Sequence, residues 1–260
     1  MVAGVRVRRR VRTLVAVGGA VLVAVGAGGC GSTDVAEAPV EKKVFAFEGE
    51  TLTVDSDDSA LVLVPADVED VEVTRQVDGW VVVGEGPEPS WRLEDGKLTL
   101  RLGCTGMISN CQGRHEVKVP RGVAVTVEDD NGSVTADGFG TALKVRSDNG
   151  EVVVRNASGP LELQSSNGEI VVERSASRSV IARSDDGEVR LGFAAAPDRV
   201  DTTSDDGEIS IELPAGKASY AVETHSDNGE IEVGVPTDKS SAHIVKARSD
   251  NGEITIRNAN

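Results

Sequence analysis

The second half of the chain repeats one short phrase seven times: Asn or Asp, then Gly, then a polar residue and a β-branched one. Successive repeat glycines lie 18, 18, 19, 20, 22 and 23 residues apart, which is the length of one coil in a stacked β-solenoid. The spacing therefore predicts an all-β, single-domain β-solenoid of stacked 18–23-residue coils. The repeat glycines are Gly132, Gly150, Gly168, Gly187, Gly207, Gly229 and Gly252.

Small and aliphatic residues alternate with polar ones on both sides of every repeat glycine. In one copy Leu143, Val145 and Ser147 precede the turn, and Val152 and Val154 follow it, all at intervals of two residues. Residues of a strand point to opposite faces with this period, so we expect these side chains to fill a core. An Asn-Gly turn between alternating segments is also the strongest short hairpin signal, which leaves a β-meander as the rival interpretation.

The repeat turns have their own chemistry. Asn-Gly and Asp-Gly tolerate the positive φ of a tight two-residue reversal, so we expect that conformation at the glycines. Stacking would also align one aspartate per coil, at a cost of about 3 kcal/mol for each like-charged neighbour at a surface dielectric near 20. Solvation and nearby Arg146, Arg183 and Arg248 are one form of relief, and Ca²⁺ bound along this ridge is the other. The candidate cation ridge is Asp148, Asp185, Asp205, Asp227 and Asp250.

The N-terminus has the regions of a secretory signal. Five arginines within residues 6–12 precede an uncharged apolar run, which leads into Gly28, Gly29 and Cys30. The last three residues resemble the lipobox of bacterial lipoproteins, which implies removal of the preceding segment and lipidation of Cys30. An uncleaved membrane anchor and an ordinary cleaved signal remain as alternatives. Under all three, the arginines keep their end in the cytoplasm, so the chain after residue 33 is expected outside it, and lipidation of Cys30 is expected to hold it at the cell membrane.

We divide the chain into a signal segment (1–30), a tether (31–43), N-terminal coils with a cap (44–120) and the seven-turn repeat solenoid (121–260). Removal of residues 1–30 takes away five arginines and no acidic residue, so 22 basic residues face 43 acidic ones, a net charge of −21. Such a surface repels nucleic acid. Cell-wall polymer with basic groups, another envelope protein or cations are the partners that it suits.

Two further cysteines agree with export. Cys104 and Cys111 form an even pair once Cys30 is assigned to lipid, and such a pair is expected to be oxidised outside the cytoplasm. A metal site is the alternative, but no second cysteine pair or nearby histidine pair completes four ligands. We therefore expect a disulfide in the N-terminal half.

The N-terminal half is also rich in short strand patterns, and Ser56-Asp57-Asp58-Ser59 looks like a diverged repeat turn. We expect it to share one sheet with the repeats, and we expect no helix after residue 43. The segment Asp95–Leu100, the cysteine pair, the segment Val117–Val125 and the repeated turns together resemble the bacterial "putative adhesin" family of β-strand-repeat envelope proteins, domain-of-unknown-function family 4097. The resemblance implies a solenoid-like β-fold and an envelope location, and it brings no catalytic residues.

An enzyme is not expected, and no cofactor is implied. The carboxylates recur equivalently in every coil, whereas acid/base catalysis needs one or two that are set apart by their surroundings. Trp80 and Trp91 fit cap packing better than a sugar platform, and His115, His225 and His243 follow no triad or metal spacing.

The sequence therefore favours a binding or scaffolding module of the envelope. A Ca²⁺-dependent or polysaccharide-active β-helix and an inert spacer are the alternatives. Because no capping segment follows Ile256, we also expect an open final coil at residues 256–260, suited to an end-to-end homodimer or a docked protein.

Overall fold

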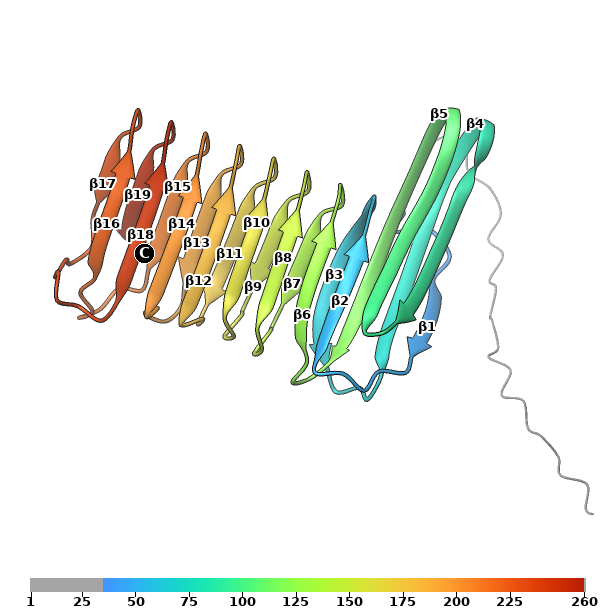
Figure 1. Ribbon diagram of the computed structural model, residues 1–260, viewed down its shortest axis with the longest axis horizontal. Coiled ribbons are helices and arrows are strands. Elements are labelled where there is room, and N and C mark those ends of the chain that lie inside the picture. The colour runs from blue at the N-terminus through green and yellow to red at the C-terminus, as the bar shows by residue number, and fades with distance from the viewer. Residues whose placement is uncertain (1–34, 260) are drawn as a thin grey trace, which may run out of the picture.

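The computed structural model describes residues 35–259, so Cys30 and the signal segment lie outside the described residues. Within 35–259 there is no helix, and nineteen strands are joined by hydrogen bonds into one sheet. Figure 1 shows the strands side by side along one long axis. The predicted all-β solenoid is confirmed.

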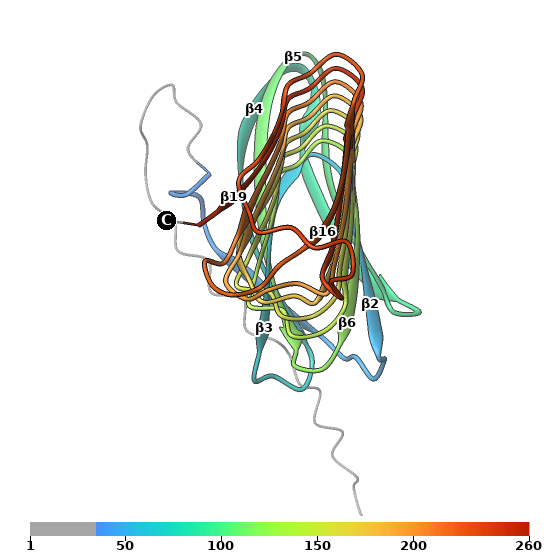
Figure 2. The same ribbon diagram turned by 90° about the vertical axis from the view of Figure 1, so that its left-hand side faces the viewer.

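Each coil contributes one strand before its turn, which we call ascending, and one after it, which we call descending. Seen along the axis, the coils overlie one another as a flattened loop (Figure 2). The ascending strands are β2 (Thr51–Ser56), β6 (Ala124–Asp129), β8 (Leu143–Ser147), β10 (Leu161–Ser165), β12 (Ser179–Ser184), β14 (Arg199–Ser204), β16 (Ala221–Ser226) and β18 (Ile244–Ser249). The descending strands are β3 (Ser59–Ala66), β7 (Val134–Asp137), β9 (Val152–Arg155), β11 (Ile170–Ser175), β13 (Val189–Phe193), β15 (Ile209–Leu213), β17 (Ile231–Val233) and β19 (Ile254–Asn258).

Equivalent strands of neighbouring coils pair in parallel. Strand β8 pairs with β6 and with β10, and β9 pairs with β7 and with β11. The register puts like on like: Val145 lies opposite Leu163, and Ser147 lies opposite Ser165. A meander would instead pair antiparallel strands across each turn. The hairpin interpretation of the repeats is therefore wrong.

The core lies between the ascending and descending layers. Leu143, Val145, Val152 and Val154 are each no more than 1% exposed, and Ile211 is fully buried. Full burial of one such aliphatic side chain contributes about 1.5–3 kcal/mol before chain entropy is subtracted. The alternation of two residues thus places the apolar side chains inside, as the sequence predicts.

A buried serine column supports the turns. The Ser165 Oγ accepts a hydrogen bond of 2.8 Å from the Gly168 N–H within its own coil. The Ser184 Oγ accepts from the Gly187 N–H at 2.9 Å and donates to the Gly168 carbonyl of the preceding coil at 3.3 Å. Ser204, Ser226 and Ser249 link two coils in the same way, whereas Ser147 and Ser165 bond only within their own coil.

The repeat glycines are required for close approach between coils and not for a left-handed backbone. None of the seven has a positive φ, so our expectation of that conformation is wrong. A Cβ built on Gly150 would lie 1.7 Å from the Gly132 carbonyl oxygen, and one built on Gly168 would lie 2.0 Å from that of Gly150. Real Cβ atoms do not approach a backbone oxygen so closely, so a side chain here would push two coils apart.

The last two coils are stacked out of sequence order. Strand β18 pairs with β14, β19 pairs with β15, and the earlier strands β16 and β17 lie outside them. The C-terminal coil is therefore enclosed on both sides, and the open end predicted at Ile256 is wrong. The outermost coil leaves Ile231 40% and Val233 38% exposed, because nothing in the described chain covers their far side.

The other end of the solenoid is a cap made of three strands. Strand β5 (Lys97–Pro120) pairs in parallel with β2 through its first residues and with β3 through its last. Strand β4 (Val71–Glu94) runs antiparallel along β5, and β1 (Glu41–Phe45) runs antiparallel along β4. The turn between β2 and β3 stacks on the first repeat turn, since the Asn131 N–H donates to the Asp57 carbonyl at 2.9 Å. This confirms Ser56–Ser59 as a diverged repeat turn.

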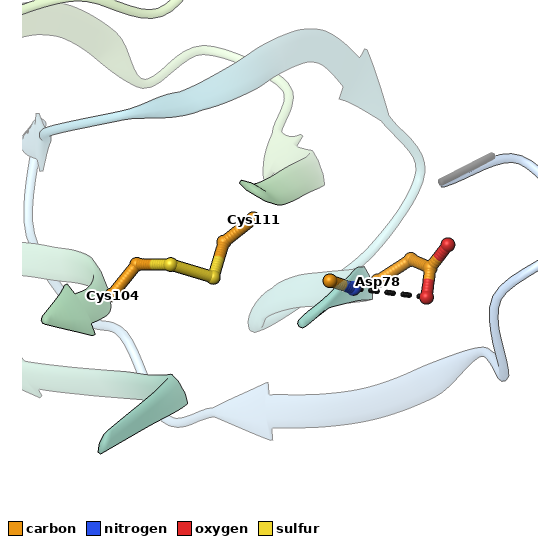
Figure 3. The surroundings of a disulfide bond; sticks show 4 residues. Asp78, Cys104 and Cys111 are labelled. Atoms are coloured by element: carbon orange, nitrogen blue, oxygen red, sulfur yellow. Dashed lines mark hydrogen bonds between the residues drawn. A yellow bond between two sulfur atoms is a disulfide. The ribbon is translucent and has the colours of Figure 1, made fainter. Parts of the chain in front are cut away.

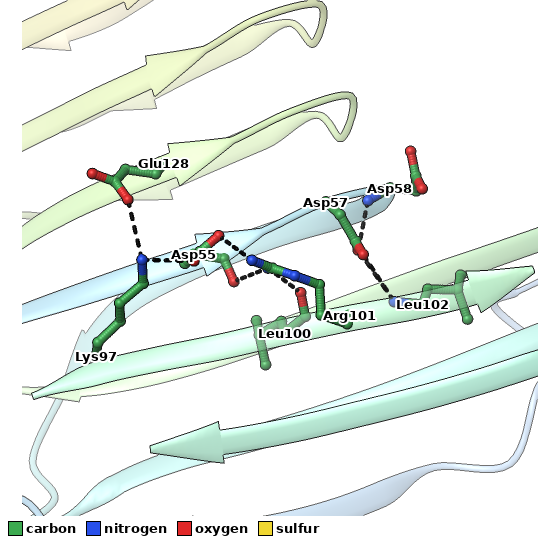
Figure 4. A network of polar contacts seen from close by, with 8 residues as sticks. All are labelled: Asp55, Asp57, Asp58, Lys97, Leu100, Arg101, Leu102 and Glu128. Carbon is green, nitrogen blue, oxygen red and sulfur yellow. Dashed lines mark hydrogen bonds and ion pairs between the residues drawn. The ribbon is translucent and has the colours of Figure 1, made fainter. Parts of the chain in front are cut away.

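A polar network fixes the point where β5 leaves the solenoid (Figure 4). Asp55 pairs with Lys97 and Arg101, both at 2.7 Å, and Asp57 accepts the Leu102 N–H at 3.2 Å. Burial alone would raise the pKa of Asp55, but hydrogen bonds from the two cations outweigh it and hold the pKa below its usual value. Above this point, residues 103–112 of β5 have only β4 as a partner.

The glycine column makes a direct prediction. Gly168→Ala should lower the free energy of unfolding by about 3 kcal/mol or more, because the new methyl group meets backbone that cannot move aside. Gly216→Ala is the matched control, since a Cβ there has nothing within 4 Å, and its change should stay within ~0.5 kcal/mol. Urea unfolding of both variants gives the comparison, and equal midpoints would contradict the packing argument.

Candidate binding surfaces

The tips of the repeat turns form a polar ridge along the solenoid. The Asn149 Nδ2 donates to the Asn131 Oδ1 at 2.8 Å, and the Asn167 Nδ2 donates to the Asn149 Oδ1 at the same distance. The ladder continues from Asn228 to Asn251, again at 2.8 Å. These amides satisfy one another, so the ridge is held by neutral hydrogen bonds beside its acidic groups.

The five aspartates of the candidate cation ridge lie at the exposed turns. Along the axis the order is Asp148, Asp185, Asp205, Asp250 and Asp227, with Ser166 on the coil between the first two and with the last two coils exchanged. Within residues 35–259, no group of three or more His, Cys, Asp or Glu is arranged to hold a metal ion. In the described part of the chain, the three arginines expected to neutralise this ridge form no ion pair with its aspartates. Calcium binding along this ridge therefore stays a prediction, and the described residues form no ligand cluster for it.

The descending face carries a second, more acidic column. Its glutamates follow the repeat glycines, and backbone hydrogen bonds place Glu188 next to Glu208 and Glu208 next to Glu253. A shallow groove runs along this face and is also lined by Arg190 and Arg257. The stacking order of the whole column is Glu151, Glu169, Glu188, Glu208, Glu253 and Glu230.

Arginines offset the repulsion between the glutamates of this column only in part. Arg190 bridges Glu169 and Glu188, and Arg257 pairs with Glu212 at 2.5 Å. Burial raises the pKa of Glu188, and the charges of Glu169 and Glu208 raise it further against the opposing effect of Arg190. The face therefore keeps an excess of negative charge, and it can accept a cationic partner along several coils.

The histidines form no catalytic constellation in the described chain. His225 is exposed beside Asp227, His243 contacts the Pro197 carbonyl at 2.8 Å, and His115 is fully buried in the cap. Burial, with the nearby Arg75, lowers the pKa of His115 to about 4, so it is neutral at ordinary pH. The three histidines therefore lie in separate surroundings and do not share a site.

The two tryptophans have different surroundings. Trp91 packs in the cap, with its ring 4.1 Å from the Arg75 guanidinium and 6.3 Å from the ring of Phe45. Trp80 is 46% exposed, so the expectation of cap packing is wrong for this residue. The two rings do not form one platform for a sugar.

The cysteine pair crosses the bend of the cap strand β5. Cys104 and Cys111 form a disulfide with their Cα atoms 6.2 Å apart (Figure 3). On the facing strand β4, the Gly79 N–H donates to the carboxylate of the adjacent Asp78 at 2.9 Å. The disulfide ties together the two arms of a projecting loop, an arrangement that the spacing of the cysteines alone does not reveal.

The comparisons with known proteins agree with this architecture. A family model described as Toastrack DUF4097 matches residues 107–257, more than half of the chain. The chain belongs to this family. No curated protein sequence gives a significant match.

Solved structures of low sequence identity are similar to this chain. A "putative adhesin" from Bacteroides fragilis has 14% identity and a TM-score of 0.52, covering 85% of this chain and 97% of its own. One from Parabacteroides merdae has 14% identity and a TM-score of 0.49, covering 86% of this chain and 98% of its own. The first of these supports the same β-solenoid fold.

One member of the serine column in this Toastrack chain is a carboxylate. Asp129 occupies the serine position of its coil and is 3% exposed, and neither of its oxygens has a hydrogen-bond partner. The neighbouring Ser56 hydroxyl is likewise unpaired. Burial raises the pKa of Asp129 to about 7, although the nearby Ser56 hydroxyl and Gly132 N–H oppose this rise, and the charges of Asp130 and Asp57 add to it.

This carboxylate should make stability depend on pH. Between pH 4 and about 7 the unfolded chain releases the proton while the folded chain keeps it, so stability falls as pH rises. Asp129→Ser should therefore increase the free energy of unfolding by about 3–4 kcal/mol at pH 8 and by much less at pH 4.5. Urea titrations at the two pH values measure this difference.

A reversed substitution is the control. Ser147→Asp places a carboxylate in the same column one coil further along and should cost more stability at pH 8 than at pH 4.5. If both variants responded equally at the two pH values, burial of an ionisable group in this column would not be the cause.

Proposed function

We infer that the chain is an exported, membrane-tethered, non-catalytic module that binds or scaffolds other components of the bacterial cell envelope. The observation that carries this inference is the acidic column on the descending face, where equivalent carboxylates repeat from Glu151 to Glu230. A catalytic site sets one or two groups apart, whereas a repeated surface suits a repeated or extended partner.

Two further features support the proposal. The N-terminal sequence combines an arginine cluster, an apolar run and Cys30, as in a lipoprotein signal. The family resemblance points to the envelope, and the Bacteroides fragilis protein of the same fold is described as a "putative adhesin". No helix among the described residues is long and apolar enough to cross a membrane.

The charge of the groove specifies the chemistry of the partner. Glu188, Glu208 and Glu253 lie along it with fewer cations than carboxylates, so it favours basic groups of cell-wall polymer or a basic protein. Such binding should weaken with salt, because the charges lie near solvent. A Ca²⁺-dependent mode would require chelator sensitivity, and a polysaccharide-active enzyme would release sugars.

Binding to purified cell wall tests the proposal. The triple variant Glu188→Gln, Glu208→Gln and Glu253→Gln should lower retention of the protein at least fivefold at low salt, because it removes three charges from one face. The control Glu48→Gln, Glu50→Gln and Glu69→Gln makes the same change in net charge on exposed residues of the cap end and should bind like the parent. Equal retention of both variants, or none by the parent, would argue against wall binding through this face.

We place the proposed end-to-end homodimer contact at the outermost coil and not at the C-terminal coil. Strands β16 and β17 expose one edge together with Ile231 and Val233, and open edges of this kind promote strand pairing. We expect residues 31–260 to dimerise as their concentration rises. The double variant Ile231→Lys with Val233→Lys should raise the concentration at which half of the chains are dimeric at least tenfold. Light scattering that shows only monomer for the parent at high concentration would exclude self-association.

A further inference from the structure

The exposed apolar side chains gather at the tip of the β4–β5 projection. Five of the nine large hydrophobic side chains exposed on the described surface are found there, far from the core. We call this group the cap tip: Trp80 (46% exposed), Val82 (47%), Val83 (73%), Met107 (83%) and Ile108 (59%). An exposed cluster of this size on a soluble surface marks a contact site.

The cap tip is built as a stiff projection. Its two strands are paired, with Val82 opposite Ile108 and Trp80 opposite Asn110, and the disulfide closes the bend. Figure 1 shows the bend of β4 and β5 rising above the neighbouring turns of the solenoid. The apolar groups are therefore held away from the core and cannot fold back onto it.

The cap tip is almost free of charge, although the whole chain is 27% charged. Residues 79–87 contain one charged residue, Glu85, and residues 102–113 contain none. The acidic groove lies on the repeat coils, which are separated from the cap tip along the axis of the solenoid. This separation lets the tip enter an apolar phase while the carboxylates stay in water.

The chain that leads to the membrane meets the fold beside this tip. The Gln76 Nε2 donates to the Ala36 carbonyl at 3.1 Å and to the Ala38 carbonyl at 3.2 Å. Gln76 precedes Trp80 by four residues of β4, which is about 14 Å along a strand. The five residues from Cys30 to Val35 reach at most about 17 Å. A membrane that holds Cys30 therefore lies within reach of the cap tip.

We propose that the cap tip inserts into the interfacial region of the lipid bilayer to which the N-terminus is attached. The protein would then touch the membrane at two places, its tether and this projection, and the solenoid would be oriented with its cap toward the lipid. The inference rests on the proposed export and tethering of the chain. Tryptophan with aliphatic and methionine side chains is the composition that partitions into this region.

The charge pattern favours a zwitterionic surface. The net charge of −21 expected after signal removal opposes anionic headgroups, and Glu85 is the single group of the tip that must stay hydrated. Glu85→Gln should therefore increase partitioning, most clearly on vesicles that contain phosphatidylglycerol. A groove on a partner protein would show no such dependence on lipid.

Vesicle flotation tests the proposal directly. Residues 31–260, which contain the whole described fold and lack the apolar segment and Cys30, should float with phosphatidylcholine vesicles. Met107→Ser with Ile108→Ser should lower the partition coefficient at least tenfold. The matched control is Val40→Ser with Val44→Ser, which are 60% and 52% exposed and lie outside both the cap tip and the outermost coil, and it should float like the parent.

Fluorescence identifies the inserted residue. The emission of Trp80 should shift to the blue with phosphatidylcholine vesicles and be quenched by brominated lipid, and Trp80→Phe should abolish both changes because Trp91 is packed in the cap. Absence of flotation, or equal loss in the two serine pairs, would overturn the proposal. Membrane fractionation of the full chain with Cys30→Ser tests the tether separately, so the two failures can be told apart.

Discussion

Contact between backbones at the repeat turns is the constraint on which the structure depends. Coils of a parallel solenoid stack at the spacing of hydrogen-bonded strands, about 4.8 Å, and at the turn this spacing leaves no room for a side chain. The position of Gly150 against the Gly132 carbonyl shows how close the approach is. In six of the seven repeat coils a serine hydroxyl then accepts a hydrogen bond from the N–H of the repeat glycine, so the glycine and the serine together maintain the stack.

The same regularity explains both the packing of the core and the charge of the surface. Parallel register puts each side chain next to its equivalent, so aliphatic residues form continuous columns inside and carboxylates form columns outside. Arg190 shows how the chain offsets the repulsion locally, by bridging the glutamates of two coils. What remains is a long acidic face along the descending strands.

The two ends of the solenoid break the regularity in different ways. At the cap, β5 continues past the turn of the adjacent coil and carries the apolar tip with it, while Asp55 and Asp57 secure the departure point. At the other end, the coil of β16 and β17 is displaced outward by the C-terminal coil. The longest glycine spacings, 22 and 23 residues, flank this displaced coil, because the chain must pass over one coil and return.

The sequence alone determined the solenoid class, the coil length and the inward residues, because a strand period of two and a repeated glycine are local signals. Leu143, Val154 and Ile211 are buried as the alternation predicts. Only the tertiary structure decided why the glycines are needed, which coil lies at the end, and that Trp80 and Met107 share one exposed tip. These features depend on which coil lies beside which and on how far β5 extends beyond its neighbour, and contacts between distant residues leave no periodic trace in a single sequence.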